Sequence, residues 1–224
     1  MPATSSNKES LKKKRGRARK IESLLRKGYP APEIALKHSN PLQLLISVIL
    51  SAQCTDVRVN MVTPALFRKY RNAKDFATAI PAELEREIHS TGFYRNKAKN
   101  IIACCKALLS GFAGEVPSTM EELIQLPGVG RKTANCVLGG AFGIAAGVVV
   151  DTHVIRLSNR LGLTTNSNAE KIEEDLCGLI DREDWIHFGN AVILHGRSIC
   201  GARNPLCNEC MLNDLCPSAN IGTK

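Results

Sequence analysis

Apolar residues recur at helical spacing along most of this chain. After Asn40 and Pro41, leucine and isoleucine return every three or four residues up to Leu50, which is the spacing of one helix face. The same pattern predicts helices over residues 81–90, 96–109, 118–126, 167–180 and 183–199. The only run of β-branched residues, Val148–Val150, is too short to found a sheet. We therefore predict an all-α fold.

Polar residues mark where several of these helices begin. Asn40 before Pro41 is typical of a helix N-cap followed by proline in the first turn. Ser118 with Glu121 has the spacing of a capping box, and a second box begins at Ser167. Both boxes predict a helix start at the serine.

One uncharged stretch, Thr133–Val150, is 18 residues long and reaches the minimum length for a membrane span. It contains four glycines and Asn135, which disfavour a membrane helix. We predict a buried helix followed by a glycine-rich loop, and no association with a membrane.

The segment Leu126–Ala134 predicts a tight turn between two helices. Gly128 and Gly130 permit positive φ and leave the backbone uncovered. The free N–H groups at the next helix start could then bind a phosphate without reading base sequence. An ordinary turn between helices is the alternative. Arg131 and Lys132 argue against it, because cations oppose the dipole at a helix N-terminus.

Lys132 and Asp151 are the candidate chemical groups. A lysine at a helix N-terminus beside Arg131 lies in positive potential, which favours the neutral amine that a Schiff-base nucleophile requires. A phosphate-binding lysine is the alternative. Asp151 follows the apolar run and could be a helix N-cap, a carboxylate facing the amine, or both.

Four of the nine cysteines, Cys200, Cys207, Cys210 and Cys216, lie within 17 residues near the C-terminal end. Four thiolates at this spacing can enclose one metal centre, either zinc or an iron–sulfur cluster. Disulfides are disfavoured because no secretory segment is evident. The other five cysteines lie among apolar residues and are expected in the core.

The net charge of +9 suggests an anionic partner, but it is unevenly distributed. Residues 1–27 hold 10 Lys or Arg and 2 Glu, whereas residues 28–224 hold 20 basic and 19 acidic residues. We therefore expect residues 1–20 to be a flexible basic tail, either solvated or tethering the protein to DNA.

Taken together, the motifs resemble the endonuclease III family of the helix-hairpin-helix DNA glycosylase superfamily, whose members contain an iron–sulfur cluster. The similarity runs from about Lys20 to Cys216. Five stretches carry it, namely Ser51–Asp56, Leu126–Ala134, Val150–His153, Leu194–Arg197 and the cysteine spacing.

The resemblance implies two helical domains with a DNA-binding cleft between them. A six-helix domain with the hairpin would span residues 34–144. Residues 21–33 with 145–224 would form a second domain, whose C-terminal four-cysteine loop holds a [4Fe–4S] cluster.

The resemblance also implies an activity in base excision repair. The chain would be a bifunctional DNA glycosylase and abasic-site lyase that removes oxidised pyrimidines from duplex DNA. Lys132 would be the nucleophile and Asp151 its activating carboxylate, followed by β-elimination. Gln53 would fill the gap left by the flipped base, and Phe93 would wedge the opposite strand. Further DNA contacts are implied for Gly128, Val129, Gly130, Arg131 and His153.

Some features depart from the family. The wedge is aromatic where leucine is common, the Lys132 to Asp151 spacing is one residue longer, and the basic N-terminal tail is an extension. The alternatives are a monofunctional glycosylase acting on mismatched adenine or thymine, and a non-catalytic DNA-binding module stapled by zinc. We expect a monomer acting on DNA with a damaged pyrimidine or abasic site. Its location would be the cytoplasm in a bacterium, and the nucleus or mitochondrion in a eukaryote.

Overall fold

The computed structural model describes residues 9–219, which are helical and contain no strand. This confirms the predicted all-α fold class. The chain divides into two compact units, which are described separately below. One runs from Glu33 to Ala146, and the other joins the segment up to Pro32 with the segment from Gly147. No helix among the described residues is long and apolar enough to cross a membrane.

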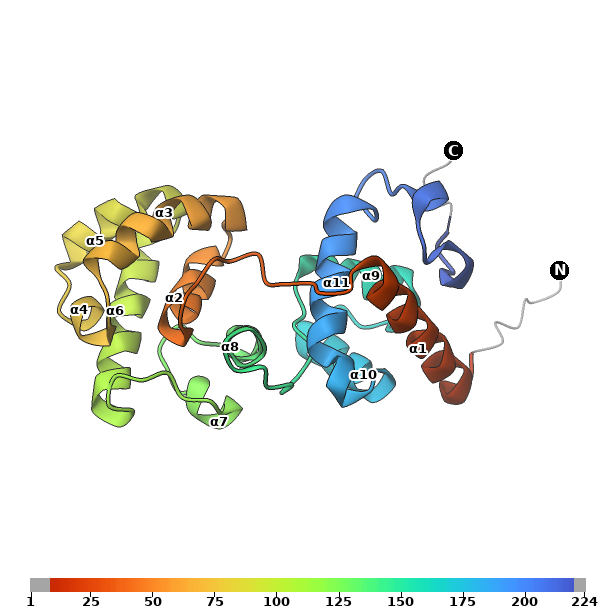
Figure 1. Ribbon diagram of the computed structural model, residues 1–224, viewed down its shortest axis with the longest axis horizontal. Coiled ribbons are helices and arrows are strands. Elements are labelled where there is room, and N and C mark those ends of the chain that lie inside the picture. Colours follow the sequence, from red (N-terminus) through yellow and green to blue (C-terminus); the bar gives the residue numbers. More distant parts are fainter. Residues whose placement is uncertain (1–8, 220–224) are drawn as a thin grey trace. The chain divides into compact units, whose positions relative to one another are not determined.

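In the unit over Glu33–Ala146, the apolar helix α2 lies between α6 and α8 (Figure 1). Its helices are α2 Pro41–Ser51, α3 Asp56–Lys69, α4 Ala73–Ala77, α5 Pro81–Ile88, α6 Tyr94–Gly111, α7 Met120–Leu123 and α8 Arg131–Phe142, with a 3-10 turn η1 at His89–Thr91. Two of these helices are short, because α4 has five residues and α7 has four. Every residue of α2 from Leu44 to Leu50 is buried, and α2 contacts α3, α6 and α8.

Polar side chains cap the N-termini of α2 and α7. Asn40 caps α2 as expected, because its side chain accepts a hydrogen bond from the Gln43 amide. The capping box expected at Ser118 lies one residue later, at Thr119, whose hydroxyl accepts from the Glu122 amide and donates to its carboxylate. Neighbouring serine and threonine offer the same cap chemistry, so sequence alone did not separate them.

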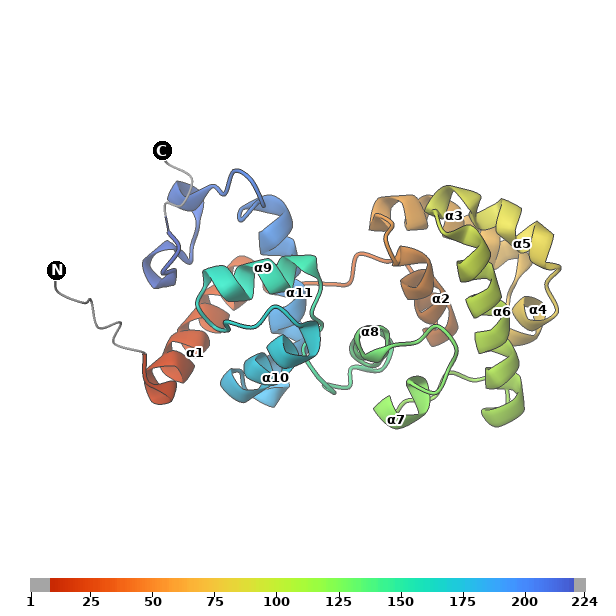
Figure 2. The same ribbon diagram turned by 180° about the vertical axis from the view of Figure 1, so that it is seen from behind.

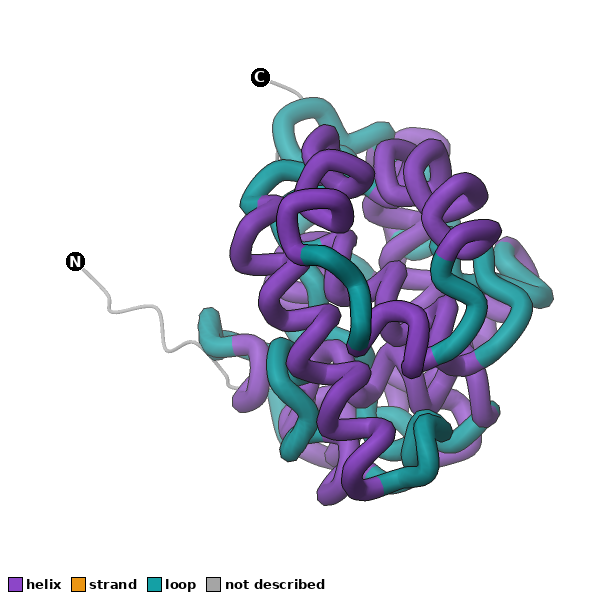
Figure 3. The backbone as a smooth tube through the Cα atoms, turned by 90° about the vertical axis from the view of Figure 1, so that its left-hand side faces the viewer, coloured by secondary structure: helices purple, strands orange, loops and turns teal. Residues whose placement is uncertain are grey.

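The second unit contains the two ends of the described chain (Figure 2). Its helices are α1 Leu11–Gly28, α9 Thr152–Arg160, α10 Ala169–Leu179 and α11 Trp185–Ser198, with 3-10 turns η2 Arg182–Asp184, η3 Cys207–Glu209 and η4 Asn213–Leu215. Here too the second capping box is displaced by one residue, because Asn168 rather than Ser167 caps α10. The tube in Figure 3 shows that the segment after α11 is mostly loop.

The expected flexible tail is wrong for residues 11–20, which belong to α1. Ala18, Ile21 and Leu25 form a buried stripe of α1 within the apolar core of this unit. Arg15 donates to the Gly178 carbonyl at 2.7 Å, and Arg17 donates to the Leu161 carbonyl at 2.5 Å. These charges therefore hold α1 in place. Residues 1–8 lie outside the described residues.

Candidate functional site

The turn between α7 and α8 has the geometry of a hairpin closed by glycine. Gly128 has φ of +78°, and a Cβ added there would lie 2.9 Å from the Cβ of Asn100 on α6. The Val129 amide donates to the Leu126 carbonyl at 3.0 Å, and both side chains are buried. The turn is therefore anchored in the core, and position 128 requires glycine both for its φ and for space.

Gly130 does not use the positive φ that glycine permits. Its φ is −92°, and a Cβ added there would meet nothing within 4 Å. Gly130 is the N-cap of α8, and it provides no side-chain cap. No acidic residue lies in the first turn of α8. The first-turn N–H groups therefore lack the usual side-chain acceptor, and a phosphate oxygen could take that place.

Arg131 and Lys132 are the first two residues of α8, and both side chains are exposed. Lys132 thus combines an accessible amine with a helix start that favours anions. This is a suitable position either for a nucleophile beside the DNA backbone or for a phosphate contact.

Asp151 is the N-cap of α9. Its Oδ1 accepts from the amides of His153 at 2.8 Å and Val154 at 2.9 Å. The cap interpretation from the sequence is therefore correct. Since Oδ1 accepts both bonds, the cap does not use Oδ2, and a second role for the carboxylate remains compatible with it.

The ring of His153 is oriented by an arginine that the sequence analysis did not single out. Arg156 Nη2 lies 3.2 Å from His153 Nδ1 and donates to the carbonyls of Gly196 at 2.8 Å and Cys200 at 3.0 Å. Because arginine has no acceptor, Nδ1 must accept and a neutral ring carries its proton on Nε2. A Cβ at Gly196 would lie 3.0 Å from His153. The glycine of the Leu194–Arg197 stretch thus permits close packing of α9 on α11.

Gln53 and Phe93 share an unusual backbone conformation. Gln53 follows α2 with φ of 53°, and Phe93 precedes α6 with φ of 47°. Left-handed φ is uncommon for residues other than glycine and marks local strain. Both side chains are exposed, Phe93 to 61%. The neighbouring Tyr94 ring lies against His89, with ring centroids 4.4 Å apart and the ring planes tilted by 40°.

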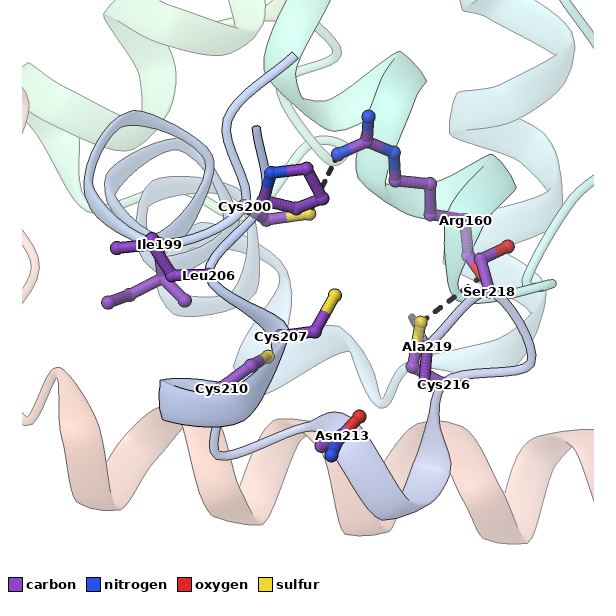
Figure 4. Close-up of a pocket in the computed structure, with 11 residues that line it drawn as sticks. Arg160, Ile199, Cys200, Leu206, Cys207, Cys210, Asn213, Cys216, Ser218 and Ala219 are labelled. Atoms are coloured by element: carbon purple, nitrogen blue, oxygen red, sulfur yellow. Dashed lines mark hydrogen bonds between the residues drawn. The ribbon is translucent and has the colours of Figure 1, made fainter. Parts of the chain in front are cut away.

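The four C-terminal cysteines line one cavity in the second unit (Figure 4). Other lining residues are mostly apolar, including Ile199 and Leu206. Within residues 9–219 no three His, Cys, Asp or Glu side chains are grouped so as to hold one metal ion. The donor set of four thiols around a shared apolar space nevertheless fits an iron–sulfur cluster, which takes one thiolate at each corner.

Two side chains support this loop from outside the cysteine set. Arg160 Nη1 lies 3.2 Å from Cys200 Sγ and donates to the Gly201 carbonyl at 2.7 Å. His195 is buried, with Nε2 3.3 Å from Cys210 Sγ and Nδ1 3.1 Å from the Tyr29 hydroxyl. Burial lowers the pKa of His195 and raises the pKa of the Cys210 thiol. A neutral His195 ring has one N–H, which can donate either from Nε2 to Cys210 Sγ or from Nδ1 to the Tyr29 hydroxyl.

The predicted site residues are divided between the two units. Gln53, Phe93, Lys132 and the hairpin belong to Glu33–Ala146, whereas Asp151, His153 and the four cysteines belong to the other unit. The supporting residues of the second unit, Arg156, Arg160 and His195, were not predicted from the sequence. A signal for Arg156 and Arg160 was present, since they follow His153 at three and seven residues and so share its helix face.

Comparison with known proteins places the chain in a family. Residues 46–182 match the model of the HhH-GPD superfamily base excision DNA repair protein. Endonuclease III of Synechocystis sp. (strain ATCC 27184 / PCC 6803 / Kazusa) is 56% identical over 92% of this chain and 94% of its own length.

Solved structures give the same result. A non-covalent endonuclease III–DNA complex has a TM-score of 0.87 at 44% identity, covering 92% of this chain and 96% of that chain. A trapped endonuclease III–DNA covalent intermediate has a TM-score of 0.89 at 42% identity, covering 94% and 99%. The chain is therefore a base excision repair enzyme of the DNA glycosylase type, and it belongs to the HhH-GPD superfamily.

Proposed function

We propose that the chain is a bifunctional DNA glycosylase and abasic-site lyase that removes oxidised pyrimidines from duplex DNA, with Lys132 as its nucleophile. The observation that carries this proposal is the exposed amine of Lys132 at the start of a helix whose first-turn amides have no side-chain cap. The similarity to a protein solved as a trapped covalent intermediate with DNA adds support.

The hairpin would hold the DNA backbone at α8. A phosphate at this helix start would accept hydrogen bonds from main-chain N–H groups and interact with the Arg131 side chain. Gln53 and Phe93 both have a left-handed backbone and an exposed side chain. Gln53 would occupy the space vacated by an extruded nucleotide, and Phe93 would contact the opposite strand. His153 would donate from Nε2 to a second phosphate. Extrusion costs least where damage has weakened pairing and stacking.

The chemical steps then use two side chains. Lys132 Nζ, in its neutral form, attacks C1′ of the deoxyribose, and the C1′–N bond to the damaged base breaks. The base leaves with the bonding electron pair and takes up a proton. The sugar ring opens to a protonated imine between Lys132 and C1′, which acidifies the C2′ protons. Loss of one such proton expels the 3′ phosphate, and this β-elimination cuts the strand.

Asp151 would receive the proton that the Lys132 ammonium must lose before attack. Its Oδ1 is held by the amides at the start of α9, which fixes the orientation of the carboxylate and leaves Oδ2 outside the cap. The cap bonds orient the carboxylate, so Asp151 would be placed to accept this proton and to stabilise the cationic transition state through its negative charge.

Cys200, Cys207, Cys210 and Cys216 would hold the [4Fe–4S] cluster. When bound, the cluster crosslinks a loop whose only regular elements are η3 and η4. Arg160 and His195, which lie 3.2 Å from Cys200 Sγ and 3.3 Å from Cys210 Sγ, would then be placed to donate hydrogen bonds to these two ligands. The loop in this way gains rigidity that its own small core does not provide.

The experiment compares wild type, Lys132→Gln and the matched control Lys99→Gln, which changes an exposed lysine on α6. Duplexes carry thymine glycol, an adenine mismatch, a thymine mismatch or an abasic site. We expect wild type and Lys99→Gln to release thymine glycol and cut the strand at the abasic site, and Lys132→Gln to do neither. Wild type acting only on a mismatch without cutting would support a monofunctional glycosylase. Binding without any excision would support a non-catalytic module, and either result would overturn the proposal.

A further inference from the structure

Lys97 is a buried lysine in the first turns of α6. Its side chain is only 4% exposed, and the described residues offer it no carboxylate partner. Burying an ammonium is costly unless it is hydrogen-bonded. Burial accordingly lowers the pKa of Lys97. A lysine at such a buried position must form hydrogen bonds that an apolar side chain could not form.

The ammonium binds two backbone carbonyls from different segments. Lys97 Nζ donates to the Leu50 carbonyl and to the Thr91 carbonyl, each at 2.8 Å. Leu50 lies in the last turn of α2, and Thr91 ends the 3-10 turn η1. Carbonyls at helix ends lack intrahelical partners and carry partial negative charge. One cation therefore joins the ends of two segments that are 41 positions apart in the sequence.

Each of these carbonyls lies just before a left-handed residue, either Gln53 or Phe93. Gln53 follows Leu50 by three residues, and Phe93 follows Thr91 by two. Both have positive φ and exposed side chains. Left-handed backbone is unfavourable at a residue with a Cβ and persists only where the surroundings hold it. Lys97 thus donates a hydrogen bond to a carbonyl at the start of each loop.

We infer that Lys97 is a positioning residue that sets the Gln53 and Phe93 loops relative to one another, so that one side chain enters the vacated space while the other contacts the opposite strand. This inference rests on the proposed function of the chain. The two loops must act on the same lesion at the same moment, and a single ammonium holding both keeps their spacing fixed.

The alternative is that Lys97 only satisfies two carbonyls and contributes to stability. The two roles predict different couplings. If Lys97 acts through the loops, removing its ammonium matters only while Gln53 and Phe93 are present. If it acts through stability alone, the loss is the same whether or not the two side chains are there.

The test uses Lys97→Met, which keeps the aliphatic stem and removes the ammonium. Lys99→Met, two residues away and exposed, is the matched control for charge. Ile101→Ala, at a fully buried position on the same helix, is the control for general destabilisation. Each change is made in the wild type and in a Gln53→Ala, Phe93→Ala background, and folding is checked by thermal melting. If Lys97→Met shows no cooperative melt, Lys97→Gln takes its place, because its amide can still donate one hydrogen bond.

Two readouts are measured below the melting temperature of every variant. The first is the single-turnover rate of thymine glycol excision with saturating enzyme. The second is the fluorescence of 2-aminopurine placed opposite an uncleavable abasic analogue, which reports insertion into the opposite strand. Misplacement of groups by about 1 Å can cost on the order of 100-fold in rate. We expect Lys97→Met to lower the excision rate 10-fold to 100-fold and to remove most of the fluorescence change. Both control variants should keep the wild-type rate and fluorescence change.

In the Gln53→Ala, Phe93→Ala background we expect Lys97→Met to cost less than two-fold further. An undiminished loss in that background, a fluorescence change equal to wild type, or a rate loss no greater than that of Ile101→Ala would each overturn the inference. Failure of the wild type to excise thymine glycol would instead overturn the proposed function, so the two failures are distinguishable.

Discussion

The two glycines of the hairpin should respond in opposite ways to the same added methyl group. Gly128→Ala places a Cβ on a residue with φ of +78°, at 2.9 Å from the Cβ of Asn100. The left-handed backbone costs roughly 1–2 kcal/mol, and overpacking typically adds about 1–3 kcal/mol. Lower entropy of the unfolded chain returns about 0.4–1 kcal/mol. We therefore expect a net loss of about 1–4 kcal/mol in the free energy of unfolding.

Gly130→Ala should leave stability nearly unchanged. Its φ of −92° suits alanine, and the added Cβ meets nothing within 4 Å. Alanine is a poorer N-cap by up to about 1 kcal/mol, which the unfolded-state gain of about 0.4–1 kcal/mol offsets. The methyl would instead stand where a phosphate approaches. Losing one hydrogen bond to a charged group costs about 1.5–3 kcal/mol, which is roughly 10-fold to 100-fold in affinity for abasic-analogue duplex.

Denaturant titrations followed by two probes test the stability half of this prediction. Far-UV circular dichroism reports all helices, whereas the only tryptophan, Trp185, lies in the other unit. Gly128→Ala should shift the circular dichroism transition more than the Trp185 fluorescence transition. Equal stability of Gly128→Ala and wild type would refute the argument from φ and Asn100. Wild-type duplex affinity in a folded Gly130→Ala would refute phosphate binding at the uncovered amides.

Three further predictions concern Phe93, Cys104 and Gly196. Phe93→Leu should keep the melting temperature, because the side chain is 61% exposed, and should compress the ratio of excision rates opposite guanine and cytosine, since an aromatic ring stacks best on purines; an unchanged ratio would contradict the wedge role. Burial raises the pKa of Cys104 to about 12, so roughly one thiol in 10⁴ is ionised at pH 8, and alkylation followed by mass spectrometry should label Cys54 well before Cys104 unless the protein unfolds. Gly196→Ala should cost about 1–3 kcal/mol in thermal unfolding, because the new Cβ would lie 3.0 Å from His153.

Local patterns were sufficient to predict the helical fold class and much of the candidate site. The Asn40 cap depends only on neighbouring residues, and the cysteine spacing places four thiols within reach of one cavity whatever the rest of the fold. The conformation of Gly130 could not be predicted from the sequence, because glycine permits both signs of φ and the N-cap geometry of α8 decides between them.

Features set by distant contacts were not predictable. The charges of the basic segment from Leu11 suggest a solvated tail, although this segment is the helix α1. Its helix is held by arginine bonds to carbonyls that lie 144 and 163 residues away in the sequence. The sequence contains a signal for the burial of Lys97, because Lys97 lies four residues before the buried Ile101 on one face of α6. The carbonyls that bind it come from other segments and could not be inferred from that pattern.

The most direct test of the central claim is identification of the residue that becomes covalently attached to DNA. Wild type is incubated with an abasic duplex and sodium borohydride, and the trapped complex is digested and mapped by mass spectrometry. The proposed Schiff base predicts a sugar adduct on Lys132 Nζ, with no trapping in Lys132→Gln and normal trapping in Lys99→Gln. An adduct on any other residue, or undiminished trapping in Lys132→Gln, would contradict Lys132 as the nucleophile.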